Sequence, residues 1–517
     1  MPSDRTVTRL SLTLALSLGA ATVLRAEAPL SAIDWLSQSV REPATLGPGA
    51  TGSEPGVAAA AQPEAVTVDV IDGLRLDALG LIPAQAAGLP PDLWGVTPTV
   101  ELARLLRAEE IDTLPALKAL IYRLLLAELN PPFDSDSHGV LFLARIDRLL
   151  DLGAVDRAAA LLELANPTTP EIFRRAFDVA LLTGEESRAC ETLRDLPEVA
   201  PTFPARIFCL ARNGDWNAAA LTLHTAVALD FVDDEEEALL SRFLDPELYE
   251  GDGPLPPPQR PSPLVWRMME AVGEPMPTGA LPIAFANAEL RPSAGWKAQL
   301  EAAERLARAG AIEPNRLLGI YTDRLPAASG GIWDRVEALQ RFDTALNAGD
   351  PGAVARALPD AWARMTEAEM EVVFAALYAE RLSRLPLTGD AARLAFQVGL
   401  LSDQYEMAAS ARKPEDGIEA FLIGLARGNP GGVRPYNRLS GAIQDAFTHS
   451  PVPSDLASLS ASKRLGEALL LAIDRISRGA AGDLVEVTEG LAFLRSVGLE
   501  GAARQTALEL LLLERRG

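Results

Sequence analysis

The sequence is poor in histidine, cysteine and aromatic residues. Its 517 residues include three histidines and two cysteines, and aromatic side chains make up 5% of the chain. His138, His224 and His449 lie far apart, and none has the spacing of a zinc site or of a cysteine–histidine catalytic pair. Because alanine and leucine dominate instead, the composition favours helices that pack closely through small side chains.

Positive charge is also scarce. The chain has 47 lysines and arginines against 71 aspartates and glutamates, a formal charge of −24. A surface of this sign repels phosphate backbones, so we expect no nucleic-acid partner. It favours instead a protein or peptide partner that carries a basic segment.

Long apolar runs are missing except near the N-terminus. Arg5 and Arg9 precede an uncharged run over residues 10–24, which is shorter than the roughly 20 residues that span a bilayer. This pattern predicts a cleavable bacterial signal peptide over residues 1–26 and a periplasmic mature protein without a stable membrane span. An uncleaved membrane anchor is the alternative, because Pro29 disfavours cleavage after Ala28.

Cys190 and Cys209 are the two cysteines, and we expect them on neighbouring helices. In an oxidising periplasm they could form a disulfide. Two buried, unpaired thiols are an equally good interpretation.

The region before residue 99 lacks helical periodicity. We expect a short helix and a flexible linker rich in proline, glycine and alanine over residues 27–65. Residues 66–98 should form an extended or irregular segment, with one short strand at 66–70 and an irregular stretch at 81–95 that lies against the helical body through Trp94.

Residues 99–250 and 264–517 carry an almost continuous helical pattern. Thr169, Pro170 and Glu171 are typical of a helix start, and Thr366 with Glu369 predicts a capping box. The proline-rich segment 251–263 cannot be helical, so we expect the boundary between two helical blocks there.

A glycine recurs between expected helices, followed five positions later by a small residue. Gly153, Gly184 and Gly214 are 31 and 30 residues apart and precede Ala158, Ala189 and Ala219. Gly498 with Ala503, and less closely Gly349 with Ala353, repeat the pattern near the C-terminus. The glycine suits a tight turn, and the alanine lets the second helix approach the first.

These residues resemble the tetratricopeptide repeat. Its second helix has a Gly-Asp turn and two alanines around a larger residue, which matches Gly214, Asp215, Ala219, Leu223 and Ala226, and also Gly153, Ala158, Leu162 and Ala165. Ile146 and Ile207 replace the small residue of the first helix, and the unit is shorter than that of the family. The resemblance covers residues 141–230. It implies an all-α fold of stacked antiparallel hairpins, an α-solenoid.

Two short motifs have the residue types of a reactive site. Asp134, Asp136 and His138 could bind a divalent cation, although aspartates before a helix are more typical of caps. Ser460 and Lys463 match the Ser-x-x-Lys pattern of penicillin-recognising enzymes without its companion motifs, and Ser460 or Ser462 as a helix cap is the better interpretation.

Three further motifs give no catalytic constellation. Glu186 and Ser187 form the Glu-Ser dipeptide found in lytic transglycosylases, but without a lysozyme-like domain. Residues 329–331 and 428–432 are predicted turns, and the acidic residues 233–237 a solvated helix start. We therefore predict no catalytic, cofactor-binding or metal-binding residues.

The sequence predicts a protein-binding or scaffolding module of the cell envelope that is not an enzyme. Trp216 and Trp296 could contact a partner, although burial in the core is expected for both. The alternatives are a cell-wall-acting enzyme with a helical superhelix and a structural subunit of an envelope or motility complex.

Overall fold

The computed structural model describes residues 75–166 and 168–513, and the regular secondary structure of this part of the chain is almost entirely helical. Helices account for 67% of the structure and strands for almost none, which confirms the predicted all-α class. The predicted signal peptide, the linker and the strand at 66–70 lie outside the described residues. Among the described residues, no helix combines the length and the apolar character needed to cross a bilayer.

The first elements of the described residues form a small layer on the helices. They are η2 (Leu76–Ala78), β1 (Ile82–Pro83) and α2 (Ala84–Ala87). The stretch predicted to be irregular thus contains a strand and a helical turn, because β1 pairs in parallel with β2 (Ala127–Glu128) further along the chain. Trp94 is buried with 1% of its surface exposed.

The next ten helices run to residue 271. They are α3 (Thr99–Ala108), α4 (Pro115–Leu126), α5 (Val140–Asp151), α6 (Val155–Ala165), α7 (Pro170–Thr183), α8 (Glu186–Asp195), α9 (Phe203–Arg212), α10 (Trp216–Ala228), α11 (Asp234–Leu244) and α12 (Pro263–Ala271), with the 3-10 turn η3 (Pro197–Val199) after α8. Helix α7 begins at Pro170 with Thr169 as its N-cap residue, as the sequence predicts.

The second half of the chain continues in the same way. Its 3-10 turns are η4 (Thr278–Ala280), η5 (Ile283–Leu290) and η6 (Pro430–Gly432), and its helices are α13 (Trp296–Arg308), α14 (Pro314–Thr322), α15 (Ile332–Asn347), α16 (Pro351–Glu367), α17 (Glu371–Ser383), α18 (Gly389–Leu400), α19 (Tyr405–Ala411), α20 (Gly417–Ala426), α21 (Arg438–Thr448), α22 (Ser454–Ala461), α23 (Leu465–Ala480), α24 (Leu484–Ser496) and α25 (Glu500–Leu512).

The capping box predicted from Thr366 and Glu369 is wrong. Thr366 lies inside the last turn of α16, and Glu369 has a φ of 55° in the turn before α17. The two residues therefore end one helix and do not start the next. A Thr-x-x-Glu pattern has the same spacing in both settings, so it does not mark a helix start by itself.

The recurring glycines occupy the turns predicted for them. Gly153, Gly184 and Gly214 have φ values of 77°, 87° and 89°, a left-handed conformation that side chains disfavour. They separate α5 from α6, α7 from α8 and α9 from α10, and the two helices of each pair are in contact. Ala158 and Ala219 are fully buried, which permits this close approach.

The buried apolar side chains form two clusters, and their division does not fall at the proline-rich segment. That segment is non-helical as predicted up to Ser262, whereas Pro263 begins α12. However, Leu264 and Met268 on α12 belong to the same cluster as Phe173 and Phe177 on α7. Helix α12 returns to pack on α7 and α11, so residues on both sides of the proposed boundary share one core.

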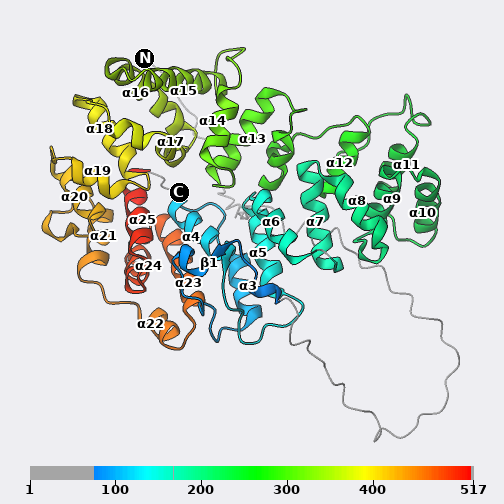
Figure 1. Ribbon diagram of the computed structural model, residues 1–517, viewed down its shortest axis with the longest axis horizontal. Coiled ribbons are helices and arrows are strands. Elements are labelled where there is room, and N and C mark those ends of the chain that lie inside the picture. The colour runs from blue at the N-terminus through cyan, green and yellow to red at the C-terminus, as the bar shows by residue number, and fades with distance from the viewer. Residues whose placement is uncertain (1–74, 167, 514–517) are drawn as a thin grey trace, which may run out of the picture. The chain divides into compact units, whose positions relative to one another are not determined.

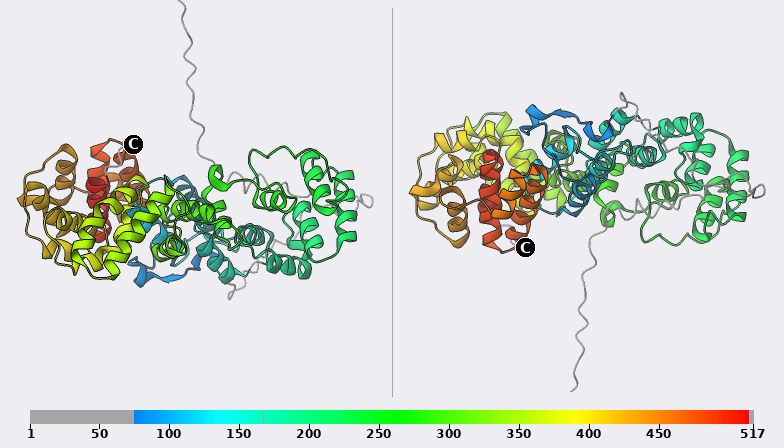
Figure 2. Two further views of the ribbon diagram at one scale, coloured as in Figure 1. Left: turned by 90° about the horizontal axis from the view of Figure 1, so that it is seen from above. Right: turned by 90° about the horizontal axis from the view of Figure 1, so that it is seen from below.

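The two ends of the described chain pack together. Helix α3 contacts α23, and α4 contacts α25, so that the C-terminal helices in orange and red lie beside the N-terminal elements in blue and cyan (Figures 1 and 2). The hydroxyl groups of Thr113 and Ser477 are 2.6 Å apart in this contact. The sequence predicts two successive helical blocks and does not indicate that the two ends of the described chain pack together.

One buried arginine joins the N-terminal layer to the helices. Arg145 on α5 donates hydrogen bonds to the carbonyl oxygens of Leu125 (2.8 Å), Leu79 (2.7 Å) and Ala127 (3.1 Å). Burial lowers its pKa to about 10, an effect that the nearby Asp77 opposes. Because its donors reach both the segment after η2 and the β2 strand, Arg145 fixes the β1–β2 layer on α5.

Candidate functional site

A groove runs over helices α6, α7 and α8, and we call it the α7 groove. Its volume is about 360 Å³. Apolar and small side chains predominate in its lining, which consists of Ala159, Leu162, Glu163, Asn166, Thr168, Phe173, Ala176, Val179, Ala180, Thr183, Glu185, Arg188, Ala189, Thr192 and Leu196. Pockets of this size and character are typical of ligand sites in proteins.

Small residues at helical spacing leave the space of the groove open. Ala159 on α6, Ala176 and Ala180 on α7, and Ala189 on α8 all line it. Ala176 and Ala180 are four residues apart, so they present the same face of α7. A larger side chain at any of these positions would occupy the groove.

The rim of the groove carries a slight excess of negative charge. Its charged residues are Glu163, Glu185 and Arg188, two carboxylates and one guanidinium. Arg188 donates a hydrogen bond of 2.8 Å to Glu163, and both side chains are largely exposed. The one positive charge is therefore already paired, which leaves the rim attractive to a cation.

A disulfide holds α8 in place behind the groove. Cys190 on α8 and Cys209 on α9 are bonded, with their Cα atoms 4.9 Å apart. Of the two interpretations that the sequence leaves open, the structure contains the disulfide. Both cysteines are buried, and the bond joins two helices that also pack against each other.

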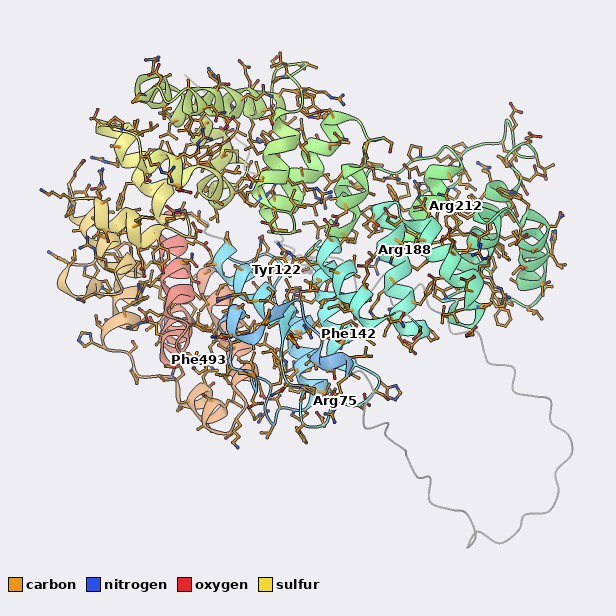
Figure 3. All side chains as sticks on the ribbon, in the orientation of Figure 1. Arg75, Tyr122, Phe142, Arg188, Arg212 and Phe493 are labelled. Atoms are coloured by element: carbon orange, nitrogen blue, oxygen red, sulfur yellow. A yellow bond between two sulfur atoms is a disulfide. The ribbon has the colours of Figure 1, made fainter. Side chains whose placement is uncertain are left out.

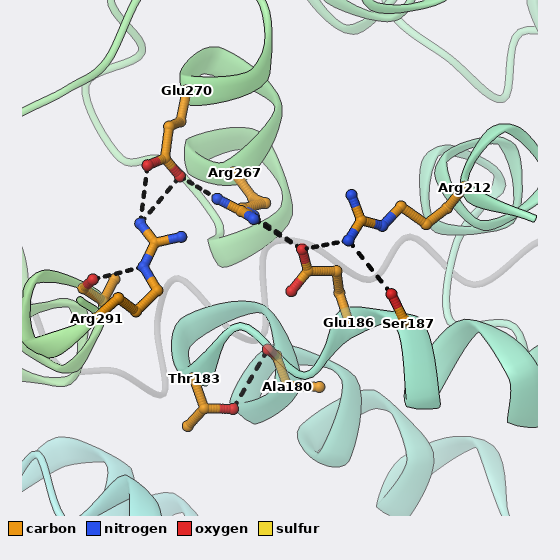
Figure 4. Close-up of polar contacts among 9 residues, drawn as sticks. Ala180, Thr183, Glu186, Ser187, Arg212, Arg267, Glu270 and Arg291 are labelled. Carbon is orange, nitrogen blue, oxygen red and sulfur yellow. Dashed lines mark hydrogen bonds and ion pairs between the residues drawn. The ribbon is translucent and has the colours of Figure 1, made fainter. Parts of the chain in front are cut away.

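A chain of ion pairs fixes the start of α8 from the other side (Figure 4). Glu186 Oε1 accepts hydrogen bonds from Arg267 (2.8 Å) on α12 and pairs with Arg212 (3.0 Å) at the end of α9. Arg267 also pairs with Glu270, which in turn accepts a 2.8 Å bond from Arg291. Figure 3 shows Arg188 and Arg212 on neighbouring helices in this part of the chain.

The position of Glu186 does not suit a general acid. Burial alone would raise the pKa of this carboxyl, but the hydrogen bond and the charge of Arg267, with Arg212, lower the pKa below its usual value. A general acid needs a carboxyl that holds its proton near neutral pH, and so a raised pKa. Ser187 accepts a hydrogen bond from Arg212, which makes the Glu-Ser dipeptide part of the ion-pair chain.

In the cluster of Asp134, Asp136 and His138, the two aspartates cap a helix start and a turn. Neither of them caps the helix that follows the cluster. Asp134 accepts hydrogen bonds from the backbone amide (2.9 Å) and hydroxyl (2.6 Å) of Thr99, at the start of α3. Asp136 accepts a 2.9 Å bond from the amide of His138. Among the described residues, no group of three or more histidine, cysteine, aspartate and glutamate side chains could hold a metal ion.

Ser460 lies in the last turn of α22, and Lys463 lies in the turn between α22 and α23. The amide of Lys463 donates to the Ser460 carbonyl oxygen, and the Lys463 carbonyl oxygen accepts from Val96. Neither Ser460 nor Ser462 caps α23, whose N-cap residue is Arg464 without a side-chain cap. The predicted cap is therefore wrong, and this turn instead binds the N-terminal segment.

The other residues considered in the sequence lie at a helix start, on the surface or in the core. Asp233 forms a capping box with Glu236 at the start of α11, which confirms the predicted helix start. His224 and His449 are exposed. Trp296 is buried as expected, whereas Trp216, expected in the core, is 51% exposed at the start of α10.

The sequence analysis does not predict the α7 groove, although the sequence contains a signal for it. The alanines at 176 and 180 lie one turn apart on the same face of α7. Two small residues on one face of a helix are equally consistent with close helix packing, so only the structure distinguishes the two. Comparisons of this chain with protein-family models, with curated proteins and with solved structures found no match.

Proposed function

We propose that this protein is a binding or scaffolding module of the bacterial cell envelope, and that the α7 groove holds a segment of a partner protein. The observation that carries the proposal is the groove itself, a cavity of about 360 Å³ lined by small and apolar side chains from three consecutive helices. Helix surfaces of this kind bind peptide segments through apolar anchors.

The charge of the protein indicates the chemistry of the partner. The chain carries a formal charge of −24, and the rim of the groove has two carboxylates against one guanidinium. A partner segment with apolar side chains for the groove and lysine or arginine beside them would fit both properties.

Exposed apolar side chains on and next to α10 provide a second candidate contact surface. Trp216, Leu221 and Leu229 are 51%, 69% and 53% exposed at or next to this helix. Such side chains gathered on one short segment are typical of contact surfaces between proteins.

We further propose that α5–α10 form tetratricopeptide-like hairpins that stack as a short α-solenoid. In support, helices of successive pairs also contact each other, α6 with α7 and α8 with α9. Stacking of this kind buries apolar faces that a single hairpin would expose.

A periplasmic location is part of the proposal. The disulfide between Cys190 and Cys209 supports it, because disulfides persist in oxidising compartments such as the periplasm. The uncharged run at 10–24 supports export through a signal peptide.

Site-specific crosslinking from the groove tests the proposal. A photo-crosslinking amino acid would replace Thr192, which lines the groove, in the chain expressed in its native envelope. The crosslinked protein would then be identified, purified and titrated against Thr192→Arg and Thr344→Arg variants. Thr344 on α15 is a matched control, since both threonine hydroxyls bond the carbonyl oxygen four residues earlier.

We expect the partner to bind the wild type and Thr344→Arg with equal affinity, and Thr192→Arg at least about ten-fold more weakly, because the added cation and bulk oppose a basic segment. Absence of any reproducible crosslink, or equal affinity for all three chains, would overturn the proposal.

A further inference from the structure

A second cavity lies where α4 and α6 meet the helices of the chain's middle, and we call it the α4 cavity. Its volume is about 470 Å³. Tyr122 on α4, labelled in Figure 3, forms one wall, and Val372, Val373 and Ala376 from α17 form another. The walls are mainly apolar, so the charged side chains among them determine which ligands could enter.

Those charged side chains are mostly cationic. Lys118, Arg123, Arg157 and Arg308 line the cavity with two carboxylates, Glu313 and Glu369. Four positive and two negative charges give the lining a net charge of +2, in a chain whose formal charge is −24. The four cations come from α4, α6 and α13, so the fold gathers them from distant parts of the sequence.

Two of these cations are already engaged with protein groups. Arg157 donates to the carbonyl oxygen of Gly310 (3.0 Å) and to Glu313 (3.2 Å), and its guanidinium lies 4.4 Å from the centre of the Tyr122 ring. Lys118 forms an ion pair of 3.8 Å with Asp112. These contacts explain how both side chains are held at the wall of the cavity.

The other two have no such partners. Arg308 Nε is buried and has no hydrogen-bond partner, and Arg123 forms no hydrogen bond or ion pair with any described residue. Burial lowers the pKa of Arg123 from its ordinary value. In a chain with an excess of carboxylates, two guanidinium groups beside one cavity without a paired carboxylate are unexpected.

Two other arginines of this protein show the contrast. Arg145 donates to four carbonyl oxygens. Arg305, one turn before Arg308 on α13, donates to the carbonyl oxygens of Thr278 (2.8 Å) and Leu281 (2.9 Å). Arg123 and Arg308 are half-buried and have no such acceptors, so their guanidinium groups are available to a ligand at the cavity wall.

We propose that the α4 cavity binds a small molecule that carries one anionic group, a carboxylate or a phosphate, on an apolar body. Arg123 and Arg308 hold the anionic group, since guanidinium groups match the geometry of both oxyanions. The apolar body lies against the α17 wall. This site is distinct from the α7 groove and does not depend on the function proposed for that groove.

Binding of three ten-carbon probes to the purified chain tests the proposal. Decanoate and decyl phosphate carry the two kinds of anionic head, and decanol has the same apolar body without charge. We expect saturable binding of at least one anion by calorimetry and no binding of decanol at the same concentrations. The tighter of the two anions then identifies the head group. Equal binding of decanol, or no saturable binding of either anion, would overturn the proposal.

Variants separate a ligand role from a structural one. We expect Arg123→Gln and Arg308→Gln each to weaken anion binding at least about ten-fold, since each removes a charge-assisted hydrogen bond. Arg384→Gln, an exposed arginine in the turn after α17, should bind as the wild type does.

Thermal unfolding without ligand gives a second readout. If Arg123 and Arg308 hold a ligand, their glutamine variants should melt at or above the temperature of the wild type. A lower melting temperature together with unchanged anion affinity would show structural arginines and contradict the proposal.

Discussion

The backbone amide of Ala116 donates a hydrogen bond of 2.8 Å to the Glu509 carboxylate. Ala116 lies in the first turn of α4, whose N-cap residue, Leu114, has no side chain to accept from the free amides there. Glu509 comes from α25, at the opposite end of the chain, and only 4% of it is exposed. A carboxylate at this position also interacts favourably with the helix dipole. The last helix of the protein thus caps one of the first.

We predict that Glu509→Ala lowers the free energy of unfolding by about 1–3 kcal/mol, because it leaves a buried amide of α4 without an acceptor. Glu509→Gln keeps an acceptor oxygen and should lose less. Urea unfolding followed by circular dichroism measures both. Equal stabilities of the alanine variant and the wild type would show that the cap does not contribute.

Local features of the fold could be predicted from the sequence. The glycine turns at Gly153, Gly184 and Gly214, the start of α7 at Pro170 and the cap at Asp233 all depend on residues within one or two turns of each other. Their physical cause is local backbone conformation and capping, which a short stretch of sequence contains.

Long-range features could not be predicted in this way. Arg145 and Arg308 are both arginines in amphipathic helices, yet one has four carbonyl acceptors and the other an unpartnered buried Nε. Asp134 caps α3 instead of the helix that follows it, because the fold brings Thr99 beside it. The cavities arise from the same long-range packing, so no local pattern specifies which alanines line a groove and which lie in the core.

The N-terminal segment is held by a contact that leaves no room for a side chain. A Cβ atom added to Gly466 at the start of α23 would lie 2.5 Å from Cε3 of Trp94, and the Gly466 amide donates to the Leu93 carbonyl oxygen. We therefore predict that Gly466→Ala destabilises the protein by about 1–3 kcal/mol through overpacking. Gly417→Ala at the start of α20 is the control, since nothing lies within 4 Å of its added Cβ.

Thermal melts of the two variants compare the sites. Gly417→Ala should melt at or slightly above the wild-type temperature, because alanine lowers the entropy of the unfolded chain. A Gly466→Ala variant that matches it would mean that the segment around Trp94 moves away without cost.

The disulfide should stabilise the part of the core around α8 and α9. Cys190 and Cys209 are separated by 19 positions, and closing a loop of that size is worth about 3 kcal/mol in the unfolded-chain model. We predict that replacing both cysteines by alanine lowers stability by about that amount. Unfolding would be measured with and without a reductant. The wild type should lose stability when its disulfide is reduced, and the double variant should not. A wild type whose stability is unchanged after complete reduction would contradict the prediction.

A buried carboxyl on α7 should make stability depend on pH near neutrality. Asp178 is 5% exposed, and its Oδ2 has no hydrogen-bond partner. Burial raises its pKa to about 7, against the opposing effect of Arg174 and Arg175. Between its ordinary pKa of 3.8 and about 7, the folded state holds a proton that the unfolded state has lost. Stability therefore falls as pH rises through this window and levels off above it.

We predict that Asp178→Asn removes this dependence. The variant should match the wild type most closely near pH 5, and by pH 8 its advantage should have grown by roughly 2–3 kcal/mol, because each pH unit within the window costs the wild type about 1.4 kcal/mol. Urea unfolding at half-unit steps from pH 5 to pH 8.5 measures the difference. Asp195→Asn, which changes an exposed aspartate at the end of α8, should give a curve parallel to that of the wild type. If the Asp178→Asn curve also runs parallel, the Asp178 carboxyl is ionised throughout, and Arg174 and Arg175 compensate its burial.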